Sequence, residues 1–127
     1  ARRVLATGLL DYLDMSLWDV EMKPRGEGHD GRIIDHFTDL DRHGALLGVA
    51  GKVLSAADAQ WCLDQGADFV TVGIGAILHH DFADRAAVDA GFRVRERPVT
   101  RDELRNEYVG PAFVDYLADG WDGLVTS

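Results

Sequence analysis

The sequence LLGVAGKV at residues 46–53 is followed, one predicted helix later, by DFVTVGIG at residues 68–75. Both segments are typical of short buried strands that stop at a glycine. Glycine has no Cβ to hold an anion away from the main chain, so two glycine-ended strands in succession can bring backbone N–H groups up to a phosphate. The pattern predicts a site for a phosphorylated ligand.

The residues around these segments predict a strand–helix–strand unit. Residues 45–50 are small and aliphatic and predict a strand, and Phe69 to Val72 is a second strand that is apolar on both faces. Ser55 can cap a helix at residues 56–65, which Gly66 ends. Continuous rather than alternating hydrophobicity indicates burial on both faces, as in a parallel sheet covered by helices. We therefore expect an α/β fold.

The other elements extend this alternation and end in helices. Leu10 to Ser16 alternates like a strand, and Thr100 with Glu103 forms a capping box before a helix. Further helices are expected at residues 3–7, from residue 33 up to Gly44, at residues 81–90, and after Pro111, which can occupy the first turn of the last one.

Composition narrows the function classes. The chain has 127 residues, of which 46% are hydrophobic, enough for one domain with a core. Its formal net charge of −9 argues against a general nucleic-acid or anionic-membrane binder. Cys62 is the only cysteine, which excludes an intrachain disulfide and a cysteine-cluster metal site and suits a reducing cytoplasm. No apolar run approaches the length of a membrane span.

Several stretches resemble one family. DYLDMS at residues 11–16, GVAGKV at 48–53 and GADFVTVG at 66–73 look like the last three βα units of an NADH:flavin oxidoreductase of the old yellow enzyme family. The resemblance covers roughly residues 1–85. It implies a (β/α)8 TIM barrel that binds FMN and NAD(P)H, with residues 1–92 supplying strands six to eight and residues 93–127 a C-terminal helical extension.

The resemblance also implies cofactor-binding residues. In the family the FMN phosphate lies on the loops after strands seven and eight, as is common in such barrels. Gly51 and Lys52 match the first loop, and Gly73 and Ile74 match the second. The family has arginine where this chain has Ile74, which has no side-chain donor. A charge-assisted hydrogen bond contributes about 1.5–3 kcal/mol, so its loss would weaken FMN binding about ten- to a hundredfold.

The resemblance does not reach the family's catalytic residues. These lie on strands one to five, so we assign no catalytic residue to this chain and expect it to be inactive alone, with little or no FMN bound. Three strands leave apolar sheet edges that a closed barrel would not have, so we expect a homo-oligomer. Two alternatives are a non-redox phosphate-binding barrel enzyme and an inactive, self-associating barrel fragment.

Each candidate residue also has a structural interpretation. The turn at Gly73 could simply connect a strand to a helix, and Lys52 could be a solvated surface residue. Asp14 and Ser16 lie on one face of their strand and could point into a barrel or make ordinary hydrogen bonds. Residues 79–81 read His-His-Asp, but adjacent side chains on a helix or turn diverge, so we expect a solvated loop and no metal site.

Overall fold

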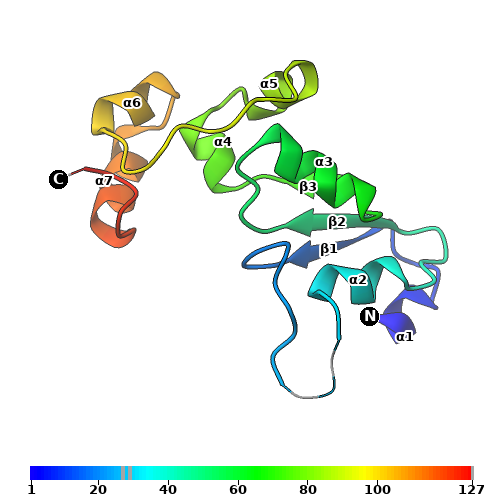
Figure 1. Cartoon of the computed structure of the whole chain (residues 1–127). Helices are drawn as coiled ribbons and strands as arrows, with labels where there is room; N and C mark the ends of the chain where they lie inside the picture. Colours follow the sequence, from blue (N-terminus) through cyan, green and yellow to red (C-terminus); the bar gives the residue numbers. More distant parts are fainter. Residues whose placement is uncertain (27, 29, 127) are drawn as a thin grey trace.

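The computed structural model describes residues 1–26, 28 and 30–126. Its centre is a parallel sheet with the strand order β1-β2-β3 (Figure 1), formed by β1 (Tyr12–Ser16), β2 (Leu46–Ala50) and β3 (Phe69–Thr71). Met15 pairs with Val49, and Val49 pairs with Val70. The fold is therefore mixed α/β with a small parallel sheet, and all three predicted strands are confirmed.

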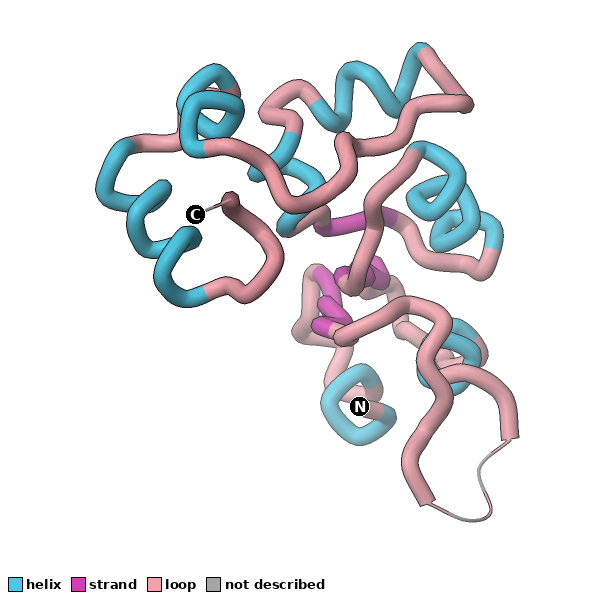
Figure 2. Tube along the Cα trace, turned by 60° about the vertical axis from the view of Figure 1, so that its left-hand side comes forward, coloured by secondary structure: helices cyan, strands magenta, loops and turns pink. Residues whose placement is uncertain are grey.

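Helices connect and follow the strands. They are α1 (Arg2–Leu5), α2 (Ile33–Thr38), α3 (Ala56–Asp64), α4 (Ile74–Leu78), α5 (Phe82–Val88), α6 (Arg101–Asn106) and α7 (Pro111–Gly120). Helices α6 and α7 lie far from α1 (Figures 1 and 2). Within the described residues, no helix has the length and apolar composition needed to cross a bilayer.

Capping accounts for several helix boundaries. Ser55 Oγ accepts a hydrogen bond from the Asp58 N–H at 3.0 Å and starts α3. The carboxylate of Asp58 accepts from the Leu54 N–H at 2.9 Å. The predicted capping box of Thr100 with Glu103 is confirmed at the start of α6. Pro111 occupies the first turn of α7, also as predicted.

The two faces of the sheet differ. Leu47 and Val49 are almost completely buried against the helices. The opposite face, here called the open face, carries Tyr12, Asp14, Ser16, Leu46, Gly48, Ala50, Phe69 and Thr71 by the alternation of side chains along paired strands.

The open face explains why the prediction that β3 is buried on both faces was wrong. β3 was expected to be buried on both faces, but Phe69 and Val70 are half-buried and Thr71 is exposed. No layer covers this side of the strand within the described residues, and Tyr12 remains 59% exposed. Gly48 makes room there for the edge-to-face pair of Tyr12 and Phe69, whose ring centroids lie 5.7 Å apart. A Cβ on Gly48 would lie 2.4 Å from the Phe69 ring.

A single hydrophobic cluster joins the strands to the C-terminal helices. It includes Val49 of β2, Phe82 of α5, Leu104 of α6 and Leu117 of α7, together with Leu124 near the end of the chain. The segments before and after residue 92 therefore pack against one shared core.

Candidate functional site

The two predicted loops meet at the carboxyl edge of the sheet. Ala50, the last residue of β2, pairs with Thr71, the last residue of β3, so both strands end at the same level. A Cβ built on Gly75 would lie 2.9 Å from the carbonyl oxygen of Val53, so the loop after β2 touches the start of α4. We call residues 51–53 together with residues 73–75 the glycine edge. The structure thus brings all four predicted site residues, Gly51, Lys52, Gly73 and Ile74, to one edge.

The glycine edge has main-chain donors without partners. The N–H groups of Lys52 and Val53 make no hydrogen bond to any described residue, and neither do those of residues 73–75, whereas the Gly51 N–H faces β3 at the end of the ladder. Residues 74 and 75 begin α4, where the first N–H groups of a helix have no internal acceptor. Polar main-chain groups need water or another acceptor, so this edge can accommodate an oxyanion.

The two glycines that end the strands differ in their structural roles. Gly51 has a φ of +151°, and a Cβ there would lie 2.6 Å from the carbonyl oxygen of Leu17. Glycine is therefore required at position 51 by packing alone. Gly73 has open space where a Cβ would stand and has a negative φ, so its backbone could accept a side chain.

Lys52 and Ile74 offer little charge to a ligand. Lys52 Nζ lies 3.2 Å from Asp19 Oδ2, in an exposed ion pair. The pKa of Asp19 is lowered chiefly by the hydrogen bond from the Glu21 main chain, with a smaller effect of Lys52. Ile74 packs against the hydrophobic cluster and presents only its N–H to the edge. Any anion at this edge is therefore held mainly by the main chain.

A pocket of about 410 Å³ beside Lys52 is not suited to a phosphate. Its charged lining consists of Lys52 and Arg93 against Asp19, Glu21 and Asp58. Three carboxylates against two cations give a negative balance, which repels an anion. The main-chain donors of the glycine edge are the better candidate for an oxyanion site.

Asp14 and Ser16 lie on the open face, as the alternation along their strand predicts. A Cβ on Gly48 would stand 2.9 Å from Asp14 Oδ1, so this carboxylate leans over the middle strand. Neither side chain makes a hydrogen bond to a described residue. Their side of the sheet is open, and their role stays a prediction.

The expected solvated loop at residues 79–81 is wrong for His79. This side chain is only 7% exposed and lies edge-on to the Phe92 ring, with the ring centroids 5.4 Å apart. Its Nε2 accepts hydrogen bonds from the main-chain N–H of Arg95 at 3.2 Å and from Arg95 Nε at 3.4 Å. His80, the next residue, is exposed as expected.

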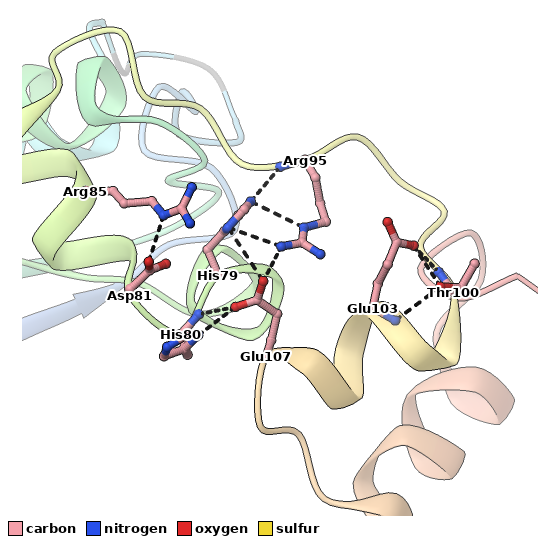
Figure 3. A network of polar contacts seen from close by, with 8 residues as sticks. All are labelled: His79, His80, Asp81, Arg85, Arg95, Thr100, Glu103 and Glu107. Carbon is pink, nitrogen blue, oxygen red and sulfur yellow. Dashed lines mark hydrogen bonds and ion pairs between the residues drawn. The ribbon is translucent and has the colours of Figure 1, made fainter.

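His79 belongs to a network of charged side chains, which we call the His79 network (Figure 3). Glu107, the residue after α6, is its central carboxylate and receives both the Arg95 guanidinium and the His80 ring. Burial raises the pKa of Glu107, but the hydrogen bonds from His80 and the charge of Arg95 outweigh it, so the pKa is lowered. The members are His79, His80, Asp81, Arg85, Arg95 and Glu107.

Ligand atoms of His79, Asp81 and Glu107 in the His79 network lie within 4.8 Å of one another, which is close enough for a shared metal ion. Nε2 of His79 accepts from Arg95, so the proton of the neutral ring is on Nδ1, the nitrogen nearest Glu107. The Glu107 carboxylate already receives a guanidinium. Only Asp81 Oδ1 lacks a partner, and one oxygen does not make a metal site. The donors are those of an ion-pair network.

Sequence reasoning could not find this network. Arg95 and Glu107 lie in a polar segment and at a helix end, positions that read as solvent-facing. The only signal was the pair of histidines, whose partners come from parts of the chain distant in sequence.

Comparison of the chain with protein-family models, with curated proteins and with solved structures finds no match.

Proposed function

We propose that this chain supplies the phosphate-binding end of an FMN-dependent NAD(P)H oxidoreductase of the old yellow enzyme type, as strands six to eight of a (β/α)8 barrel. The observation that carries the proposal is the glycine edge. Two consecutive parallel strands end level with each other, and five N–H groups that follow them, those of Lys52, Val53 and residues 73–75, have no partner among the described residues. A phosphate has the charge and the acceptor atoms that such a set of donors favours.

The roles of the chain are confined to binding. Gly51, Lys52, Gly73 and Ile74 would form the FMN phosphate site, with the N–H groups of Lys52, Gly73 and Ile74 as donors. When bound, FMN supplies the redox chemistry by accepting a hydride from NAD(P)H and passing it to an electron-poor acceptor. We assign no proton donor and no pair of substrate-binding residues to this chain, so we expect no turnover of NAD(P)H by these 127 residues alone.

The decisive experiment removes the main-chain N–H of Gly73 and compares the result with a variant that keeps this N–H. Gly73→Pro deletes the N–H, and the φ of −92° at this position is near the range of proline. Gly73→Ala is the matched control, because it keeps the N–H and its Cβ has open space. A hydrogen bond to a charged acceptor contributes about 1.5–3 kcal/mol, so we expect FMN to bind about ten- to a hundredfold more weakly to the proline variant than to the alanine variant.

The readout is quenching of flavin fluorescence, with riboflavin as a second ligand. Riboflavin lacks the phosphate, so its affinity should be equal in the two variants. Equal FMN affinities in the two variants would refute the role of the Gly73 N–H.

A non-redox phosphate-binding barrel enzyme is the second candidate, and Ile74 favours it. With no charged side chain after β3, the edge has no element that selects FMN over another phosphorylated compound. Inorganic phosphate that protects the edge amides from hydrogen exchange, with no such effect of FMN, would favour this candidate.

The open face supports a proposal on assembly. Parallel sheets are normally covered on both faces, whereas here Tyr12, Leu46 and Phe69 present apolar surface, and the outer edges of β1 and β3 have no paired strand in the described chain. We therefore propose that the isolated chain associates with copies of itself. Light scattering coupled to size exclusion should give a dimer or larger species, and a monomer at high micromolar concentration would contradict the proposal.

A further inference from the structure

The main chain at the centre of the segment at residues 93–97 is held by one imidazole, that of His79. The segment runs in an extended course from the end of the α5 region to α6 and lines, with Leu54 and Gly123, a pocket of about 490 Å³. Its first residues are fixed to the start of α3, because the Val94 N–H donates to the Leu54 carbonyl at 2.9 Å. Its centre is fixed by Arg95, which donates from the main chain and from Nε to Nε2 of His79.

The main-chain N–H and the Nε of Arg95 both donate to Nε2 of His79, and they determine which protonation state of the imidazole fits the site. A neutral ring with its proton on Nδ1 has a lone pair on Nε2 for both of them. A proton on Nε2 would turn both hydrogen bonds into contacts between two donors. These contacts would lie inside the protein, because His79 is only 7% exposed. The Arg95 guanidinium also lies beside the ring, with Nη2 3.4 Å from Nδ1, so a second positive charge would be added next to the first.

The charged groups facing His79 come from several elements. Arg95 of the 93–97 segment and Arg85 of α5 oppose a charge on the ring, while Glu107 at the end of α6 and Asp81 before α5 favour it. Burial is the largest influence and the charge of Arg95 the second, and together they lower the pKa of His79. Glu107 does not reverse this balance, because its carboxylate is shared with Arg95 and His80.

We propose that His79 is an acid-sensitive latch, which holds the centre of the 93–97 segment against α4 when it is neutral and releases it when it is protonated. Release is local. Glu107 remains joined to the α4–α5 junction through the main-chain N–H of His80, which donates to Oε2 at 3.0 Å, and through the His80 ring at 2.7 Å. That pair does not involve the Nε2 of His79, so α6 stays attached while the Arg95 main chain leaves the ring. Release would free the segment from Arg95 to Arg97, whereas Arg93 and Val94 stay bonded to the start of α3.

The direction of the pH effect follows from linkage. The open state binds the proton at the ordinary histidine pKa of about 6.5, and the closed state binds it only at lower pH. The latch is therefore fully closed above about pH 6.5 and opens as the pH falls toward the closed-state pKa. Within that window the opening constant rises by up to about tenfold per unit of pH.

Hydrogen exchange and NMR on the whole 127-residue chain test the latch. The Arg95 amide should lose protection, corrected for the intrinsic exchange rate, by up to about fivefold between pH 6.5 and pH 5.5. Its chemical shift should follow the titration of the His79 ring. Amides of α6 should keep their protection over the same range.

Two variants separate the latch from ordinary acid destabilisation. His79→Gln offers a carbonyl oxygen near the position of Nε2 but does not titrate, so the loss of Arg95 protection should disappear. His43→Gln removes an exposed histidine elsewhere in the molecule and should leave the loss unchanged. Constant Arg95 protection in the unmodified chain would overturn the proposal, and so would a loss shared equally by Arg95 and α6. The measurement on the unmodified chain decides the matter even if the glutamine variant fails to fold.

Discussion

Replacing Ile74 by arginine should restore the charged phosphate contact that the glycine edge lacks. Ile74 is the first residue of α4, and its N–H has no partner within the described residues. A charge-assisted hydrogen bond contributes about 1.5–3 kcal/mol, which corresponds to about ten- to a hundredfold in affinity. The side chain is half-buried against the core, so part of its packing is lost, but the aliphatic stem of arginine can cover some of the same surface.

The assay compares FMN and riboflavin binding to Ile74→Arg and to Ile74→Met. Methionine is the control because it keeps an apolar side chain of similar volume without a charge. We expect FMN affinity to rise at least tenfold in the arginine variant over the methionine variant, with riboflavin unchanged. The gain should shrink in high salt, since a partly exposed charge is screened.

Two results would refute this reasoning. Equal FMN affinities in the arginine and methionine variants would mean that position 74 does not face the phosphate. An equal gain for riboflavin would mean that arginine acts on the flavin ring or on the fold.

The remaining predictions concern the scaffold. Gly51→Ala should destabilise the chain by about 1–3 kcal/mol in urea denaturation, because its Cβ would lie 2.6 Å from the Leu17 carbonyl oxygen. Gly110→Ala, with open space at its Cβ and a φ of −64°, should change stability by less than about 0.5 kcal/mol, and equal effects of the two changes would contradict the packing argument. Thr100→Ala should cost about 1 kcal/mol by the same measurement through loss of the α6 cap, and an unchanged midpoint would show that the cap is dispensable. Burial raises the pKa of Cys62 to about 11, so its thiol should react with Ellman's reagent only after denaturation, and rapid reaction in the native state would contradict its burial.

The helix starts were predictable because their causes are local. Ser55 and Thr100 cap helices through N–H groups three residues away, and Pro111 suits a first turn whatever surrounds it. Helix ends were less predictable. The helix from Ile33 was expected to continue up to Gly44 but ends at Thr38.

The candidate site also has features that could be predicted from the sequence and features that could not. The glycines at positions 51 and 73 could be located from the sequence, since each follows an apolar strand and parallel strands end at one edge. The ion pair that Lys52 makes at that edge could not be predicted from the sequence. Lys52 is paired with Asp19, which comes from the loop after β1, and no local pattern links the two residues.

The sequence by itself determined the order of strands and helices, their parallel pairing and the glycines that end two strands, because these depend on hydrophobic patterns and on backbone freedom within a few residues. Only the tertiary structure decided that His79 is buried against Arg95, that one face of the sheet is uncovered and that Lys52 forms an ion pair with Asp19. Burial and charge pairing depend on which distant segments meet in space, and that is set by packing of the whole core.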